Sequence, residues 1–463
     1  VVDGLVGDSV FFADQLSSPW TAVAGRFNVS GAAYSSGLAY RKFTGTYNGH
    51  NLVVLVNENV NTDVVRGVAT TVESLSGTDQ ITNSASVTSQ SMVDYADRVD
   101  AVRINLGSDR YNGVDARTVV STATSTVGSG VDVDTLTSIE WAKTGAGDDW
   151  LIGSSVANRL EGGLGNDLLM AGLGNDTLVG GLGIDTADYS DQASGVTITL
   201  NGDSIGSAVF TDTTNNDDLY SIENVIGTNQ ADSITITDTN ANWIDGGAGA
   251  DTILAGAGND TIIYNASAVT LDGEAGTDTL VVRDAVLDLT AANVSGSKLK
   301  NFEVIDLRGS QGTQLTMSAE SVASLSTTSD AVTVYADQND VIELVGTWTL
   351  GANTVVDSKV YHTWTRTSTS PAGTASVTAS AEATVRFVGT GAADTITGTS
   401  NPDVLWGLNG ADSLSGGDGD DTFVGGAGND SLVGGNGFDT ADYSTSTGPL
   451  VVDLTAGTVT GDG

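Results

Sequence analysis

The chain has 463 residues, of which 17 are Lys or Arg and 58 are Asp or Glu, so its formal charge at pH 7 is −41. This excess of negative charge repels nucleic acid and anionic lipid, and both are excluded as partners. Apolar residues make up 39% of the chain, which is too many for a disordered acidic protein.

The chain has no cysteine, so metal ions rather than disulfides are expected to hold it together. It contains no run of 18 apolar residues, and no transmembrane segment is predicted. It starts with Val1 and Val2 rather than Met, and we interpret it as a segment of a longer chain or a matured product. Residues 1–92 show β alternation, clearest at 52–56, between glycine-rich turns.

A nonapeptide, G-G-x-G-x-D-x-U-x with U a large apolar residue, then recurs in three clusters. The first cluster begins at Thr144, and its sixth positions are Asp149, Asn158, Asp167, Asp176 and Asp185. The middle cluster is more degenerate and carries Asp232, Asp251, Asp260 and Asp278. The third begins at Gly389 and carries Asp394, Asp403, Asp412, Asp421, Asp430 and Asp439.

The spacing of this repeat predicts its geometry. The glycines permit a tight turn that brings backbone carbonyls together, and the Asp places a carboxylate at the exit of the turn. The x-U-x tail predicts a three-residue strand with one inward side chain, so each nonapeptide makes half a coil and turns on the same side lie 18 residues apart. The predicted inward residues are Leu151, Leu160, Leu169, Leu178, Leu405, Leu414, Phe423 and Leu432.

These nonapeptides resemble the repeats-in-toxin (RTX) calcium-binding family. The resemblance implies parallel β-rolls in which each Ca²⁺ lies between two stacked turns, held by the aspartates named above. It implies that glycines of the same turns take part: Gly163, Gly165, Gly172, Gly174, Gly247, Gly249, Gly256, Gly258, Gly417, Gly419, Gly426 and Gly428.

Carried onto this sequence, the resemblance also gives the facing residues. The pairs are Asp149 with Asp167, Asp167 with Asp185, Asn242 with Asp260, Asp260 with Asp278, Asp394 with Asp412, Asp403 with Asp421, Asp412 with Asp430, and Asp421 with Asp439. Asn158 faces Asp176 and departs from the pattern, so that site is expected to be weak or empty. The half-turn at 264–272 lacks the motif and leaves Asp251 with doubtful support.

One apolar side chain per nine residues is a thin core. Burying it contributes about 1.5–3 kcal/mol, whereas fixing each residue of backbone costs about 1–2 kcal/mol. The stacks are therefore not expected to fold without metal, and folding should be coupled to calcium binding.

A larger unit encloses the repeats. The sequence DTADYS closes the first and third clusters, at 185–190 and 439–444, and a relative, VDYAD, lies at 93–97. Each copy is followed by an alternating strand, at 102–106, 196–200 and 450–454. In the first two copies a polar loop and then Ser-Ile-Glu, at 138–140 and 221–223, lead into the next nonapeptides.

A different segment, 284–386, separates the second and third clusters. Its predicted strands are 301–307, 332–335 and 341–344, and Ser318 is a suitable N-cap for a short helix over 318–325. The arrangement is similar to a module that recurs in very large bacterial RTX surface proteins.

The sequence thus predicts an elongated all-β protein in which RTX β-rolls alternate with β-rich, sandwich-like modules. The predicted domains are a β-rich region at 1–92, a first roll unit at 93–190, a second and eroded unit at 191–283, an intervening module at 284–386, a third roll at 387–444 and the start of a further unit at 445–463.

No catalytic site is predicted. The only histidines are His50 and His362, and no motif of a zinc protease, cysteine or serine nucleophile, or phosphate-binding loop occurs. The RTX resemblance implies type I secretion and folding on extracellular calcium. We expect a structural protein of the cell surface or matrix, such as an S-layer, filament or adhesin subunit, whose partner is a second copy or a cell-surface ligand. The alternative is the calcium-binding secretion region of an RTX enzyme or toxin.

Overall fold

The structure is a computed structural model. It describes residues 18–28, 39–47, 50–57, 64–67, 71–73, 80–83, 92–96, 99, 101–107, 118–121, 132–137, 139–202, 204–211, 215–290, 298–309, 312–326, 329–351, 353–356, 359–369, 372–446, 450–453 and 458–461. The chain forms two compact units, Val1–Asp238 and Thr239–Gly463. The predicted fold class is confirmed, because the described secondary structure consists of β-strands, many of them in long parallel sheets, apart from one short helix.

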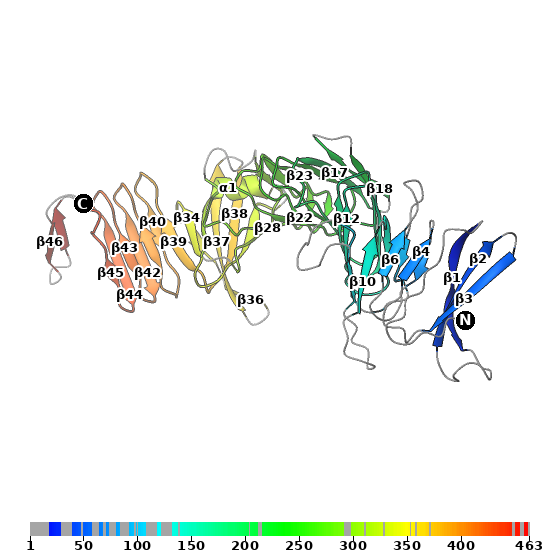
Figure 1. The fold of residues 1–463 in the computed structure, drawn as a ribbon. Coiled ribbons are helices and arrows are strands. Elements are labelled where there is room, and N and C mark those ends of the chain that lie inside the picture. Colours follow the sequence, from blue (N-terminus) through cyan, green and yellow to red (C-terminus); the bar gives the residue numbers. More distant parts are fainter. Residues whose placement is uncertain are drawn as a thin grey trace. The chain divides into compact units, whose positions relative to one another are not determined.

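In the first unit, successive strands between residues 141 and 188 alternate between two sheets, so that two nonapeptides complete one coil. The winding of such coils is visible in the third roll (Figure 1). In spatial order, one sheet contains β4 (Val64–Gly67), β6 (Gln80–Asn83), β10 (Asp132–Thr137), β9 (Thr118–Ser121), β8 (Val102–Asn105), β12 (Trp150–Ser154), β14 (Leu168–Gly172), β16 (Thr186–Asp188) and β20 (Asn224–Ile226). The other contains β5 (Thr71–Glu73), β7 (Met92–Asp94), β11 (Trp141–Lys143), β13 (Arg159–Leu164), β15 (Thr177–Leu182), β19 (Asn216–Tyr220), β18 (Ser204–Phe210), β17 (Val196–Asn201) and β21 (Ser233–Ile236). A separate antiparallel sheet contains β1 (Ser18–Asn28), β2 (Ala39–Tyr47) and β3 (His50–Asn57).

The period of 18 residues is visible in the strand register. Leu151 pairs with Leu169, and Leu160 pairs with Leu178. All four side chains are fully buried between the two sheets, as predicted. The flanking residues of each strand face outward because successive side chains of a strand point to opposite faces.

The strands predicted after the tyrosine motifs each begin an antiparallel excursion. β8 pairs with β9 and β9 with β10, while β17 pairs with β18 and β18 with β19. In both cases the outer strands of the excursion also pair with strands of the parallel sheet. The excursion is therefore an insertion within the sheet, and the coils resume beyond it.

The second unit contains further parallel sheets. One contains β22 (Trp243–Asp245), β25 (Thr261–Ile263), β28 (Thr279–Val281), β31 (Val304–Asp306), β33 (Ala331–Tyr335), β38 (Ala372–Ser380) and β37 (Lys359–Thr369), which also pairs with β35 (Thr349–Leu350) and β36 (Thr354–Val356). A shorter one contains β23 (Thr252–Leu254), β26 (Thr270–Asp272) and β30 (Leu299–Lys300). A third contains β29 (Val286–Asp288), β32 (Gln314–Ser318), β34 (Val341–Val345), β39 (Thr384–Val388), β41 (Val404–Trp406), β43 (Thr422–Val424) and β45 (Thr440–Ala441). The remaining strands are β40 (Thr395–Thr397), β42 (Ser413–Asp418) and β44 (Ser431–Asn436), the pair β24 (Ala257–Gly258) and β27 (Ala275–Gly276), and the hairpin β46 (Leu450–Asp453) and β47 (Thr458–Gly461).

Parallel pairing continues through the intervening segment, because β34 pairs with β39 and β39 pairs with β41 of the third roll. The predicted helix is present as α1 (Ala319–Leu325), and Ser318 caps it in a reciprocal capping box with Ser321. Leu405, Leu414 and Phe423 are buried as predicted. Leu432 is only half-buried, because it belongs to β44, which pairs with β42 alone among the described strands. The domain boundaries drawn from the sequence stay predictions.

Candidate metal centres in the stacked turns

In the described part of the chain, nine stacked pairs of turns are joined by the same hydrogen bond. The backbone N–H of the sixth residue in one turn donates to Oδ1 of the sixth residue in the turn 18 positions later. This bond joins Asp149 to Asp167, Asp167 to Asp185, Asn158 to Asp176, Asn242 to Asp260, Asp260 to Asp278, Asp394 to Asp412, Asp403 to Asp421, Asp412 to Asp430, and Asp421 to Asp439, at 2.6–3.1 Å. The predicted stacking is confirmed, and calcium binding at these residues stays a prediction.

The second carboxylate oxygen of many of these aspartates lacks a hydrogen-bond donor among the described residues. Oδ2 is buried and accepts no hydrogen bond from them in Asp149, Asp167, Asp176, Asp185, Asp278, Asp412 and Asp421. A buried carboxylate oxygen without a donor costs free energy unless a cation or proton neutralises it. These turns therefore fit a bound cation.

Threonine at the second position closes three of the predicted turns. The Thr228 N–H donates to Asp232 Oδ2 at 2.7 Å, and the Thr390 N–H donates to Asp394 Oδ2 at 2.6 Å. The Thr399 hydroxyl donates to Asp403 Oδ2 at 2.9 Å. In these G-T turns the chain's own donors satisfy the oxygen that stays unpartnered in the seven turns above.

The turn of Asp251 shows where its oxygens converge. Nδ2 of Asn265, in the next turn on the same side, lies 2.7 Å from the Gly247 carbonyl oxygen, 3.2 Å from that of Gly249 and 3.3 Å from Asp251 Oδ2. Two carbonyls and one carboxylate thus point at a single amide group. The expected weakness of the Asp251 site has a physical reason, since the Asn265 amide lies where a cation would lie.

The glycines allow the turns to stack closely. At Gly163, φ is +110°, and a Cβ there would lie 2.3 Å from the Gly145 carbonyl oxygen of the stacked turn. At Gly162, a Cβ would lie 2.1 Å from Asp167 Oδ2, so only glycine leaves room for the carboxylate. Positive φ occurs at eleven of the twelve predicted glycines, namely Gly163, Gly165, Gly172, Gly174, Gly247, Gly249, Gly256, Gly417, Gly419, Gly426 and Gly428. Gly258 lies in β24 and is the exception.

Burial dominates the electrostatics of these carboxylates. It raises the pKa of Asp149 and Asp185 to about 6, of Asp167, Asp278 and Asp403 to about 7, and of Asp176 to about 8. The charge of Asp149 adds to the effect on Asp167. Burial also raises the pKa of Asp232, Asp412 and Asp421. A cation between the turns would lower these raised pKa values, because it favours the charged carboxylate.

The donor set fits a hard cation such as Ca²⁺. Within the described ranges, no three His, Cys, Asp or Glu side chains converge on one point, so side chains alone would not form a site. Carbonyl oxygens at positions two and four together with carboxylates, as seen around Asn265, give an all-oxygen set. Calcium takes six to eight such ligands in flexible geometry. The aspartates and turn carbonyls would hold the ion, and the ion would supply the positive charge that balances the buried carboxylates.

Four acidic residues outside the predicted repeats occupy equivalent positions. Asp176 N–H donates to Asp217 Oδ1, Asp185 N–H to Glu223 Oε2, Asp278 N–H to Glu303 Oε2, and Thr313 N–H to Asp340 Oδ1, at 2.8–3.0 Å. The sequence interpretation missed them because they break the step of nine. The signals that could have found them are Asp-x-Leu at 217–219 and the shared apolar-Glu pair of Ser-Ile-Glu and Asn-Phe-Glu at 221–223 and 301–303.

The tyrosine motif has a structural role. Asp94, Asp188 and Asp442 each accept the backbone N–H two residues later, at 2.7–2.9 Å. In the first two copies this turn has a buried tyrosine at its centre: Tyr95 and Tyr189 are at most 1% exposed. Tyr189 packs edge-on against Phe210, with ring centroids 5.6 Å apart. The motif therefore ends a strand and anchors the chain in the core.

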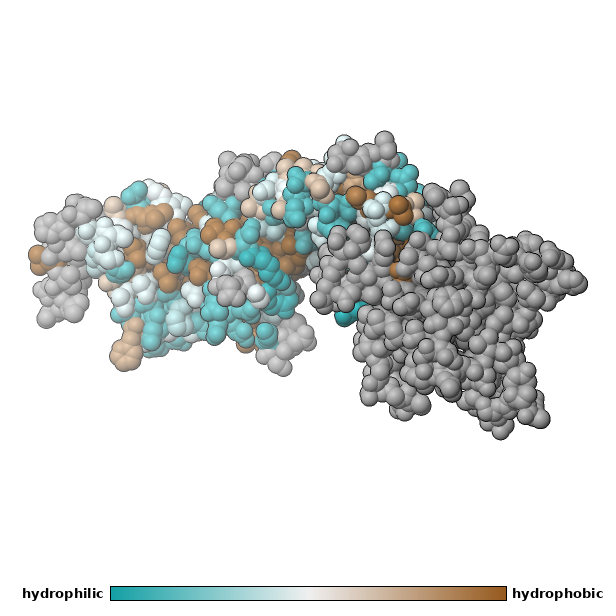
Figure 2. Space-filling model, in the orientation of Figure 1, coloured by the Kyte–Doolittle hydropathy of each residue, from teal (hydrophilic) through white to brown (hydrophobic). Residues whose placement is uncertain are grey.

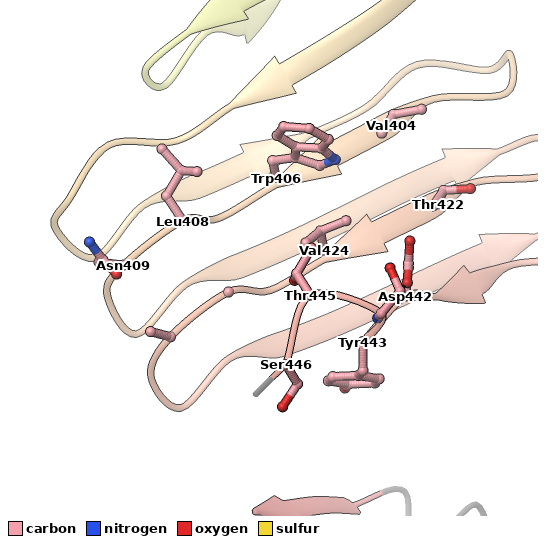
Figure 3. A pocket seen from close by; sticks show the side chains of 13 residues that line it. Val404, Trp406, Leu408, Asn409, Thr422, Val424, Asp442, Tyr443, Thr445 and Ser446 are labelled. Atoms are coloured by element: carbon pink, nitrogen blue, oxygen red, sulfur yellow. The ribbon is translucent and has the colours of Figure 1, made fainter. Parts of the chain in front are cut away.

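The two histidines and one hollow are further features of the chain. His362 is buried, its Nδ1 lies 2.8 Å from Asn353 Oδ1, and its Nε2 lies 3.2 Å from Asn401 Nδ2. The side chain of His50 lies outside the described residues. A hollow of about 790 Å³ lies over β41 and β43, where Trp406, Val424 and Tyr443 line it (Figure 3). Among the described residues that line it, Asp442 and Tyr443 are titratable.

The same segments match a family model. The RTX calcium-binding nonapeptide repeat matches in four copies, at residues 152–187, 236–267, 388–423 and 406–441. The chain carries RTX calcium-binding repeats. Such repeats are typical of extracellular proteins exported by type I secretion. No curated protein matches the chain. Among the described residues, no helix is long and apolar enough to cross a membrane.

Proposed function

We propose that this is an extracellular, calcium-dependent structural protein of the cell surface or matrix, without enzymatic activity. One observation carries the proposal: columns of buried aspartates stack at 18-residue intervals, and many have an unpartnered Oδ2. Filling these positions with calcium joins each turn to the next, so that the ions act as cross-links of the coil.

The chain is expected to fold where it acts, outside the cell. With calcium scarce, the buried carboxylates repel one another and the thin core does not compensate. At the millimolar calcium of the extracellular medium, binding supplies the missing free energy. An S-layer, filament or adhesin subunit fits this behaviour, and the partner would be a second copy or a cell-surface ligand.

Repetition favours a structural role. Coils recur in both units, and the Asx turn of the tyrosine motif is repeated at Asp94, Asp188 and Asp442. Hydrophilic and hydrophobic residues intermingle over the described surface (Figure 2). Repeated units that stack on their neighbours supply surface and length rather than one reaction centre.

The test compares the purified chain in EGTA, in millimolar Ca²⁺ and in millimolar Mg²⁺. We expect far-UV circular dichroism of a disordered chain in EGTA, β structure in calcium, and ordered assemblies in calcium by electron microscopy. Release of the native protein from cells by EGTA would support surface attachment. Circular dichroism and assembly unchanged by EGTA would contradict the proposal. A calcium-folded monomer joined to a catalytic domain in the full-length gene would favour the secretion region of an RTX enzyme or toxin.

A further inference from the structure

The turn that carries Asp176 lacks an aspartate partner on its N-terminal side. There the residue 18 positions earlier is Asn158, whose Nδ2 donates to the Glu140 carbonyl at 2.8 Å. Ser154 donates to Asn158 Oδ1 through both its N–H and its hydroxyl. The chain's own donors and acceptors thus satisfy the Asn158 side chain, and this position needs no cation.

On its C-terminal side the same turn meets Asp217, 41 residues later. Asp176 N–H donates to Asp217 Oδ1 at 2.9 Å, the bond that otherwise joins residues 18 apart. Asn216 N–H donates to Asn175 Oδ1 at 3.0 Å, as Ile184 N–H does to Asn166 within the regular repeat. The register of β15 and β19 places Leu178 opposite Leu219. Asp217 and Leu219 therefore take the sixth and eighth positions of a nonapeptide after an insertion.

Both carboxylates have an oxygen that accepts no hydrogen bond from the described residues. The Tyr189 hydroxyl lies beside Asp217 and partly offsets the effect of burial on the pKa of that carboxyl, but this hydroxyl is itself buried without a hydrogen-bond partner among those residues. Asp176 is 2% exposed and Asp217 is 1% exposed, and Oδ2 of each is buried without a hydrogen-bond partner. Asp176 is preceded by Gly172 and Gly174 at positions two and four, the positions whose carbonyls point at the Asn265 amide in the Asp251 turn. No amide side chain takes that place here among the described contacts of Asp176.

We propose that Asp176 and Asp217 form a calcium site that is completed by a turn outside the recognised repeats. The ligands are the two carboxylates and the carbonyls of the Asp176 turn. The antiparallel insertion β17–β18 lies between the two halves in sequence, so the ion also locks this insertion into the sheet. The inference rests on the proposed calcium binding of the roll.

The experiment counts calcium ions on the full chain by native mass spectrometry. Asp217→Asn keeps Oδ1 as the acceptor for Asp176 N–H, and asparagine already occupies the sixth position at Asn158 and Asn242. The matched control is Asp218→Asn, which removes the same charge from the exposed neighbouring residue. We expect one ion fewer in D217N and no change in D218N.

Further variants distinguish the loss of this ion from a folding defect. D176N should lose the same ion, and the double variant D176N/D217N should lose one ion rather than two. Circular dichroism in calcium should show that each variant is folded. A full ion count in folded D217N, or the loss of two ions in the double variant, would overturn the inference. Wild-type chain that binds no calcium would instead refute the proposed function, whereas an unchanged D217N count beside a reduced D167N count refutes this site alone.

Discussion

At the residue scale, the sixth position of each turn decides whether a coil needs a cation. Aspartate leaves Oδ2 without a donor in turns such as that of Asp167. The side chain of Asn158 is satisfied by the Glu140 carbonyl and by Ser154, and threonine at the second position satisfies the carboxylate of Asp403. Similar turns in one chain thus differ in whether they require a cation, because one or two side chains differ.

Converting Asn265 to Asp should create a calcium site. The change replaces the amide that contacts Gly247, Gly249 and Asp251 with a carboxylate, and it keeps Oδ1 as the acceptor for the Ser267 N–H. We expect one additional calcium ion by native mass spectrometry. The control Asn229→Asp adds the same charge at an exposed turn residue. An unchanged ion count in N265D would contradict the assignment of the amide as the occupant.

The raised pKa values predict the pH dependence of the metal-free chain. Burial raises the pKa of Asp167 to about 7 and of Asp176 to about 8, above the ordinary value of 3.8. The folded state therefore holds protons that the unfolded state has released, and its stability falls as pH rises from about 4 to 8. After calcium removal, circular dichroism should therefore show more residual β structure at pH 5 than at pH 8. In saturating calcium the trend should reverse, because calcium binds the deprotonated carboxylates.

At the scale of the element, the half-coil is specified by glycine as strictly as by aspartate. Gly416 is buried, and a Cβ there would lie 2.0 Å from Asp421 Oδ2. Gly391 belongs to the same roll, and a Cβ there meets no atom within 4 Å. Neither glycine has a φ in the left-handed region, so alanine at the two positions differs only in the space that it meets.

Gly416→Ala should therefore displace the Asp421 carboxylate, whereas Gly391→Ala should be tolerated. We expect G416A to lose about 1–3 kcal/mol of unfolding free energy in calcium, the usual cost of overfilling a packed site, and to bind one ion fewer. Urea unfolding and ion counting on both variants provide the measurement. Equal effects of the two substitutions would show that the carboxylate does not occupy that space.

The element scale also shows how far the sequence predicts the structure. The coils, the stacked pairs and the Ser318-capped helix follow from local rules: a period of nine, the reach of a strand and a capping residue. Asp217, Glu223 and Glu303 do not follow, because insertions place them outside that period. The Asn265 amide was missed because its role depends on a turn 18 residues away.

At the scale of the whole molecule, the formal charge of −41 raises the question of whether calcium acts by screening or by occupying sites. Screening depends on ionic strength alone, and at 1 M salt the Debye length is about 3 Å. Site occupancy depends on the chemistry of the ion. Buried oxygens such as Asp167 Oδ2 and Asp421 Oδ2 are beyond the reach of diffuse counter-ions, and they require an ion that sheds water and accepts carbonyl ligands.

Monovalent salt should therefore not fold the chain, whereas calcium should. In EGTA, we expect 1 M NaCl to contract the chain without restoring β structure. Millimolar calcium at low ionic strength should contract the chain and restore β structure. Magnesium should fall short of calcium, because it demands octahedral geometry and retains its water. Small-angle X-ray scattering reports the dimensions, which approach a radius of gyration of about 80 Å for an unfolded chain of this length, and circular dichroism reports the strands. Recovery of β structure by 1 M NaCl alone would show that repulsion, rather than the unfilled carboxylate positions, keeps the chain unfolded.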